Sequence, residues 1–208
     1  MLSAKRIAAF FFGSMAVFVL LMAPWPGLEE AYGRLFRAGG NLLFVHFGPG
    51  GTVHFRPSST TDPHRDTELV LTNRRSGFGR YFFISSRVQG YKPTAFILAL
   101  TLGTPLPWSR RWRAVLWGFL CVNVYVIIKL VVLLLACFSR ETTLALFPVG
   151  PMSKGLLEYL NWLLVVSEAG RLILPLGIWV LVTFRRKDWE AVLQRTATKP
   201  KACSMTGK

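Results

Sequence analysis

Long apolar runs, rather than a regular alternation of apolar and polar positions, dominate this chain. About 20 helical residues at about 1.5 Å each cross the hydrocarbon of a bilayer. One run is short, but Pro93 suits a first helical turn and Trp108 suits the headgroup region, so a helix over 93–108 is workable. The pattern predicts an α-helical integral membrane protein with four transmembrane helices. These cover 7–25, 93–108, 114–138 and 159–184.

Between the first two runs, shorter alternating segments predict a small sheet. Residues 41–57, "NLLFVHFGPGGTVHFRP", predict two strands around a "GPGG" turn. "TELVLT" at 67–72 predicts a third strand, and "RYFFISS" at 80–86 a fourth strand or a stretch lying on the membrane surface. The expected organisation is an N-terminal transmembrane anchor, a β-rich extracytoplasmic segment, a three-helix transmembrane region and a basic tail of disordered composition. These parts cover 1–26, 27–92, 93–186 and 187–208.

Two histidines in the predicted hairpin raise the question of a metal site. If Phe47 pairs with Thr52, then His46 lies opposite Val53 and His54 opposite Val45. Adjacent cross-strand pairs point to opposite faces of a sheet, so the two imidazoles would not share an ion. Because zinc needs three or four converging ligands, we expect no metal and no other cofactor.

Lysine and arginine indicate the orientation of the chain. Twelve of them fall in the two termini and in the connection 108–113, against only Arg140 and Lys154 in the connection 139–158. The positive-inside rule therefore predicts cytoplasmic termini and a location in the cell (inner) membrane. The net charge of +15 suits anionic lipid headgroups, and nothing in the pattern indicates nucleic acid as a partner.

Three ionisable residues fall inside the predicted spans: Lys129, Glu168 and Arg171. Charges at membrane depth usually face the bundle interior in pairs. Lys129 and Glu168 fall at similar depth, and Arg171 lies one turn from Glu168 on the same helix face. The sequence predicts an intramembrane polar cluster, which is either an interhelical clamp or part of a functional cleft.

A hydrolytic site is the alternative interpretation. A lysine desolvated by lipid can act as the base for a serine nucleophile, for which Ser85, Ser86 and Ser167 are candidates. Glu168 would keep Lys129 charged, however, and Ser86 is expected at the outer rim of the membrane, well above Lys129. No catalytic residue is assigned on this basis.

The order of features resembles the small membrane proteins that accompany exosortases in bacteria, of the exosortase H-associated type. The likeness rests on "SSRVQGYKPTAFILALTLGTPLPWSRRWRAVLWGFLCVNVYVIIKLVVLLL" and "EAGRLILPLGIWVLVTFRR". It includes Gly90 and Tyr91 before the second run, and with Ser86 and Arg87 these form the interface candidates. Exosortases resemble cysteine peptidases, but Cys121 and Cys137 lie on one predicted span and the region around Gly90 has no thiol.

The resemblance implies an accessory role in the sorting of surface proteins, with lipid and an exosortase-like membrane peptidase or its substrates as partners. We therefore expect a non-catalytic, multi-pass membrane accessory or scaffold protein. The alternative is a membrane-embedded hydrolase or transpeptidase-like enzyme that uses a serine or cysteine with Lys129 or Arg171.

Overall fold

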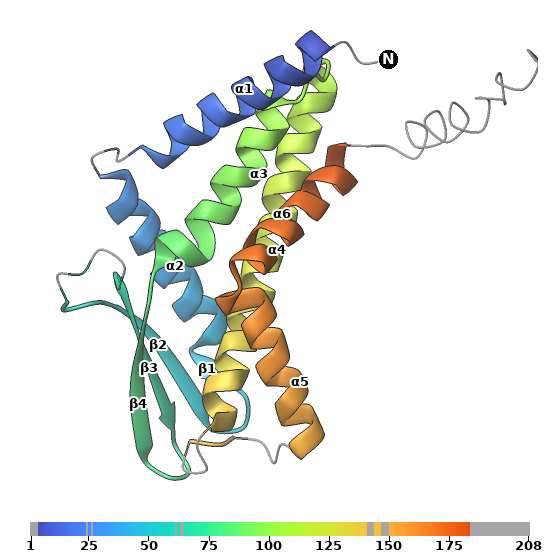
Figure 1. Ribbon diagram of the computed structural model, residues 1–208. Helices are drawn as coiled ribbons and strands as arrows, with labels where there is room; N and C mark the ends of the chain where they lie inside the picture. The colour runs from blue at the N-terminus through green and yellow to red at the C-terminus, as the bar shows by residue number, and fades with distance from the viewer. Residues whose placement is uncertain are drawn as a thin grey trace, which may run out of the picture.

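The computed structural model describes residues 4–183, except 24, 26, 61, 63, 64, 141–143 and 147–149. Apolar helices gather at one end of the molecule, and a four-stranded sheet with two further helices forms the other end (Figure 1). In chain order the elements are α1 (Ala4–Met22), α2 (Leu28–Phe44), β1 (His46–Phe47), β2 (Gly51–Pro57), β3 (Thr67–Asn73), β4 (Phe78–Ile84), the π-helical turn η1 (Arg87–Tyr91), α3 (Lys92–Gly103), α4 (Trp108–Arg140), α5 (Pro151–Asn161), the π-helical turn η2 (Trp162–Val166) and α6 (Glu168–Thr183).

The sheet is antiparallel throughout, in the order β1-β2-β3-β4. Alternate residues of β3 are buried, as expected when one face of a sheet covers a core and the other meets solvent. Leu69 and Leu71 of β3 pair with Phe55 and Val53 of β2, and all four are buried. We call the sheet together with α2 the sheet domain. Its core therefore lies against the buried face of β2 and β3.

Helix α2 closes part of that core and also completes the edge of β2. Phe36 and Phe44 contact the ring of Phe55, with centroids 6.1 and 6.2 Å apart. The Asn41 amide donates to the carbonyl of Phe55 at 2.9 Å and accepts from the Phe55 N–H at 2.8 Å. Because β1 has only two residues, Asn41 supplies the pairing that a longer neighbouring strand would have given this part of β2.

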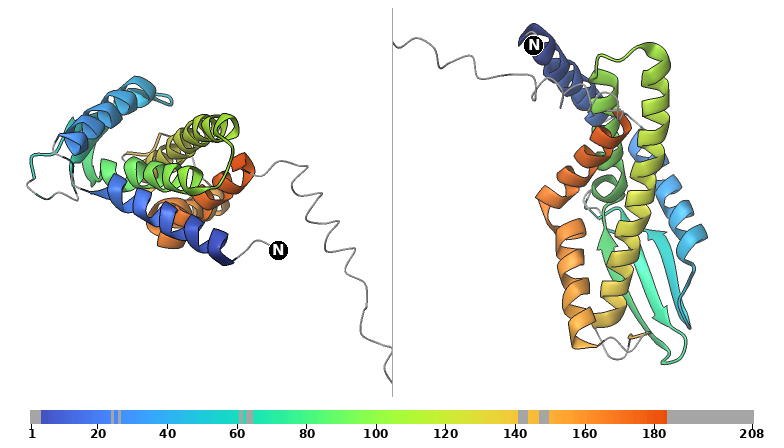
Figure 2. Two further views of the ribbon diagram at one scale, coloured as in Figure 1. Left: turned by 90° about the horizontal axis from the view of Figure 1, so that it is seen from above. Right: turned by 90° about the vertical axis from the view of Figure 1, so that its right-hand side faces the viewer.

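Helix α4 joins the two ends of the molecule. Its 33 residues run the whole height of the fold, beside α3 and α6 at one end and beside the sheet domain and α5 at the other (Figure 2). Toward its C-terminus, Leu134 and Phe138 are fully buried, and the ring of Phe138 stacks on Phe47 with centroids 5.6 Å apart. The same helix thus belongs to the apolar bundle and to the core of the sheet domain.

The prediction of four transmembrane helices is wrong. Among the residues that the structure describes, only α4 is long and apolar enough to cross a membrane. Helix α3 has 12 residues and ends where Thr104 turns to an extended conformation, so its length of about 18 Å is too short. The run at 159–184 breaks at Ser167, whose ψ of 126° separates η2 from the 16-residue α6. Hydropathy counts apolar residues but does not detect such breaks.

Part of the predicted hairpin is also wrong. Residues 41–44 end helix α2 instead of forming a strand, whereas β2, β3 and β4 lie where strands were expected. His46 pairs with Thr52 and Phe47 with Gly51, one residue away from the register considered above. Thr52 and His54 share a face of β2, so His46 lies on the same face as His54, not the opposite one. The described residues contain no group of three or more potential metal ligands.

Candidate binding pocket at the boundary of the apolar layer

The apolar end of the molecule has an outward-facing surface that is hydrophobic. On α4 this surface consists of exposed residues that all precede Lys129, whereas Leu130, Leu134 and Phe138 after it are buried. Helices α1 and α6 add further exposed apolar side chains to the same end. Apolar surface of this extent marks contact with a membrane or a protein partner. The α4 residues are Leu116, Trp117, Phe119, Leu120, Val124, Ile127 and Ile128.

We call the end of the molecule with this exposed apolar surface the apolar layer, and it ends near Lys129. Ile97 of α3 packs on Gly118 of α4, 3.0 Å from where a Cβ on that glycine would stand. The two helices run in opposite directions. Eleven residues back from Ile97 is Ser86, and eleven residues forward from Gly118 is Lys129, so Ser86 lies at about the level of Lys129. The 21 residue steps from Trp108 to Lys129 span about 31 Å, which is close to the thickness of bilayer hydrocarbon.

The structure describes the side chains of two of the three residues in the predicted polar cluster. Lys129 is 1% exposed on α4, and Glu168 is exposed at the start of α6, where it lines a small cavity with Lys92 and Phe18. Thr183 of α6 and Arg113 of α4 line the same cavity, so these two residues lie at about one level. Fifteen residues back from Thr183 is Glu168, and fifteen residues forward from Arg113 is Ile128, so Glu168 lies at about the level of Lys129. The pairing of Lys129 with Glu168 stays a prediction, and the side chain of Arg171 lies outside the described part of the structure.

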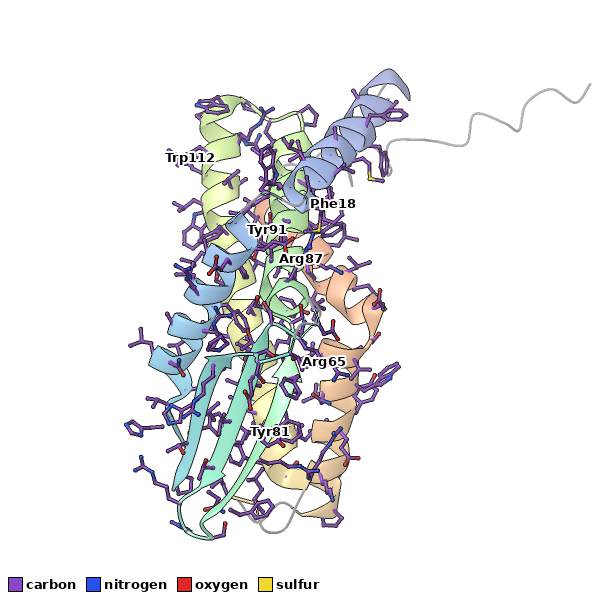
Figure 3. The ribbon with its side chains drawn as sticks, turned by 90° about the vertical axis from the view of Figure 1, so that its left-hand side faces the viewer. Phe18, Arg65, Tyr81, Arg87, Tyr91 and Trp112 are labelled. Carbon is purple, nitrogen blue, oxygen red and sulfur yellow. The ribbon has the colours of Figure 1, made fainter. Side chains whose placement is uncertain are left out.

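A polar pocket of about 380 Å³ opens at this same level. It lies between the first turns of α2, the connection from β2 to β3, and η1. Three of the four interface candidates, Ser86, Arg87 and Tyr91, line it, and Figure 3 shows Arg87 and Tyr91 close together where the sheet domain meets the apolar helices. The other lining residues are Glu29, Glu30, Tyr32, Gly33, Arg37, Pro57, Ser58, Thr60, Asp62 and Asp66.

Ser86 is held by Asp66, which precedes β3. The backbone N–H of Ser86 donates to Asp66 Oδ1 at 2.7 Å, and its hydroxyl donates to Oδ2. Arg37 Nη1, Ser86 Oγ and Asp66 Oδ2 lie 3.1, 3.6 and 3.7 Å from the point that a Cβ on Gly33 would occupy. The absence of a side chain at Gly33 therefore lets three polar groups from α2, η1 and the β2–β3 connection converge.

Arg87 and Tyr91 fix the end of α1 to the pocket. Arg87 forms an ion pair with Glu29 at 2.5 Å and donates to the carbonyl of Met22 at 2.9 Å. The Tyr91 hydroxyl donates to the carbonyl of Leu21. These carbonyls belong to the last turn of a helix, where no backbone N–H is available to them. The two side chains thus hold the apolar helix α1 against the rim of the pocket.

Gly90, the fourth interface candidate, lies behind the pocket wall. A Cβ at this position would collide with the hydroxyl of Tyr32 and approach Phe36 to 3.5 Å. The Tyr32 and Tyr91 rings pack edge to face with centroids 5.3 Å apart. Burial raises the pKa of Tyr32 to about 12, so its hydroxyl stays protonated and can donate a hydrogen bond throughout the physiological range. Gly90 is required for packing.

The lining of the pocket contains both signs of charge. Its four carboxylates are those of Glu29, Glu30, Asp62 and Asp66, and its two guanidinium groups are those of Arg37 and Arg87. Arg87 is paired with Glu29, whereas Arg37 makes one long hydrogen bond of 3.4 Å to the carbonyl of Asp66. Within the described part of the chain, Arg37 forms no ion pair, so most of its N–H donors remain available to a ligand.

The geometry favours binding over covalent catalysis. Ser86 is only 1% exposed and its hydroxyl is engaged by Asp66, so it does not present a nucleophile to the pocket. Cys121 and Cys137 are on α4 and do not line the pocket. Sequence reasoning missed Asp66, Arg37, Tyr32 and Glu29, because only the fold brings α2 and the β2–β3 connection to η1.

Comparisons with known proteins add no family assignment. No family model matches the sequence, and no curated protein or solved structure shows significant similarity to it.

Proposed function

We propose that this chain is a membrane-anchored, non-catalytic accessory protein that presents a binding pocket at the outer surface of the cell membrane. Helix α4 crosses the bilayer, with Arg110, Arg111 and Arg113 on the cytoplasmic side and the sheet domain outside. Because α3 alone is too short, the continuous helical segment of η1 and α3 over 87–103, about 25 Å long, carries the chain through the same layer beside α4. The observation that carries this proposal is the change along α4 at Lys129. Large apolar side chains of α4 are exposed only before that residue, whereas those after it are buried or partly buried, and α5 and Phe47 of β1 pack against this part of the helix.

The accessory role accords with the resemblance to exosortase-associated membrane proteins. In this role, the sheet domain engages a membrane peptidase or the surface proteins that such a peptidase sorts. The enclosed hydroxyl of Ser86 supports binding in preference to the alternative of a hydrolase or transpeptidase-like enzyme. Accordingly, we expect serine-directed and cysteine-directed activity probes to leave the purified chain unlabelled.

Charged substitutions on the apolar face of α4 test the membrane anchor. In the double variant Leu120→Arg, Val124→Arg, each arginine near the centre of a spanning helix costs about 2.5–3.5 kcal/mol of insertion free energy. We expect the wild-type chain to stay in the membrane pellet after alkaline carbonate extraction, and the double variant to be lost from it.

The matched control is Leu35→Arg, Leu42→Arg on α2, where both leucines are exposed but lie on the sheet domain. Leu42 is 82% exposed, more than either position on α4, so an aqueous surface tolerates arginine there. Equal extraction of the two double variants, or release of the wild-type chain by carbonate, would show that the face of α4 does not contact lipid.

A further inference from the structure

We propose that the pocket binds a phosphoethanolamine headgroup, with the phosphate at Arg37 and the ammonium at the carboxylate of Glu30. This inference rests on the proposed membrane anchorage, because that anchorage places the pocket among the headgroups of the outer leaflet. The favoured source of the headgroup is a lipid of that leaflet.

The position of the pocket favours a lipid headgroup. Arg87 and Tyr91 line it and at the same time bind the last carbonyls of the apolar helix α1. Its level is that of Ser86, near the end of the exposed apolar face of α4. Its volume of about 380 Å³ is at the lower end of the range of roughly 300–1,000 Å³ that is common for small-molecule sites.

The charges of the lining favour a zwitterion over a simple anion. Three of the lining carboxylates are already paired with arginines, Glu29 with Arg87, Glu30 with Arg34 and Asp62 with Arg65, so the charges around the pocket are close to balanced. A ligand that carries both a positive and a negative group preserves this balance, whereas a bare phosphate does not. Arg37 nevertheless offers planar, paired donors suited to phosphate oxygens, and it is not neutralised by a described carboxylate. A ligand that carries a phosphate and an ammonium group can bind Arg37 and the carboxylate of Glu30 together.

The chemistry of the carboxylates distinguishes ethanolamine from other headgroups. Glu30 pairs with Arg34 on the exposed side of α2 at 2.5 Å through one oxygen, which leaves its second oxygen able to accept a hydrogen bond. A primary ammonium donates three hydrogen bonds, a choline headgroup has none to donate, and a glycerol headgroup carries no positive charge. The expected order of affinity is therefore ethanolamine, choline, glycerol.

Calorimetric titration of the purified full-length chain in detergent tests this order. The soluble probes are glycerophosphoethanolamine, glycerophosphocholine and glycerophosphoglycerol. We expect glycerophosphoethanolamine to bind about tenfold more tightly than glycerophosphoglycerol, the difference that about one charge-assisted hydrogen bond provides. Arg37→Gln should weaken all three ligands by a similar factor, whereas Glu30→Gln should reduce only the preference for ethanolamine.

Two further variants separate binding from folding. Arg74→Gln, at an exposed arginine in the turn between β3 and β4, is the matched control and should bind like the wild type. Arg37→Lys keeps the charge and should retain part of the affinity, and melting temperatures should show that each variant is folded. Equal affinity for the three probes, or unchanged binding by folded Arg37→Gln, would overturn the proposed ligand.

Native mass spectrometry of the chain from nanodiscs that contain phosphatidylethanolamine and phosphatidylglycerol identifies the source. Retained phosphatidylethanolamine indicates a bilayer lipid, whereas binding of the soluble probe without retained lipid indicates a free phosphoethanolamine compound. Failure of the anchorage has a different signature, since carbonate would then release a chain that still binds the probe. If the chain resists carbonate extraction but binds the three headgroup probes equally, the proposed ligand is wrong and the proposed membrane anchorage stands.

Discussion

At the scale of single residues, the boundary between the apolar layer and the sheet domain is formed by polar side chains with partners far away in the sequence. Asp66 fixes Ser86, and Glu29 fixes Arg87. Arg87 and Tyr91 also bind carbonyls near the end of α1. These contacts position groups around the pocket and leave Arg37 as the cation best able to meet a ligand.

Lys129 and Glu168 provide a test at this scale. If they interact across α4 and α6, Lys129→Met leaves the carboxylate of Glu168 without its cation, and Glu168→Leu leaves a buried ammonium group. Because Glu168 is exposed, we expect each single variant to lose about 1.5–3 kcal/mol, the usual contribution of a hydrogen bond to a charged group. The double variant should be less destabilised than the sum of the single variants.

Thermal unfolding of the three variants in one detergent measures this coupling. Strictly additive losses would show that the two residues do not interact. Normal stability in the single variants, together with loss of partner binding, would instead indicate that the cluster has a functional role.

At the scale of elements, small residues let the short apolar helices pack closely. A Cβ on Gly103 of α3 would lie 2.8 and 2.9 Å from the backbone N and Cα of Ser14 on α1, and closer still to its hydroxyl oxygen. Ser14 is buried at this crossing. Close backbone approach over Gly and Ser is a common way for helices to associate within a bilayer, where apolar burial alone gives little driving force.

The variant Gly103→Val should therefore push α1 away from α3. Overpacking of this kind typically costs about 1–3 kcal/mol, and we expect a matching fall in the melting temperature in detergent. The matched control is Gly13→Val on α1, next to Ser14, where a Cβ would meet no atom within 4 Å. Equal melting temperatures for the two variants would contradict the close α1–α3 crossing.

At the scale of the whole molecule, α4 connects an apolar layer to a domain with its own sheet. In the proposed topology, the connection between α3 and α4 is cytoplasmic and the connection between β2 and β3 is outside. Residues exposed at these two places are Ser109 and Ser59.

Cysteine labelling tests this topology in intact cells. Ser59→Cys should react with a membrane-impermeant thiol reagent added outside, and Ser109→Cys should react only after the membrane is permeabilised. The wild-type chain, which has three cysteines, gives the background. Labelling of Ser109→Cys from outside would invert the proposed orientation, and labelling of both variants would exclude a barrier between the two sites.

The sequence by itself determined much of the local structure. Short segments of alternating apolar positions located β2, β3 and β4, and in β3, where one face covers the core, burial itself follows a period of two. The long apolar run at 114–138 located most of α4. The same alternation of apolar positions wrongly predicts a strand at 41–44, because Leu42, Leu43 and Phe44 suit the end of an amphipathic helix as well as a strand.

Tertiary structure alone decided how many helices can cross a membrane and where the pocket lies. The helix ends at Thr104 and Ser167 are backbone breaks inside apolar sequence, so composition did not reveal them. Ser86 and Tyr91 were identifiable as border residues, but Asp66 and Arg37 were not. Their role depends on α2 and the β2–β3 connection meeting η1 over Gly33, and such long-range contacts leave no periodic signal in the sequence.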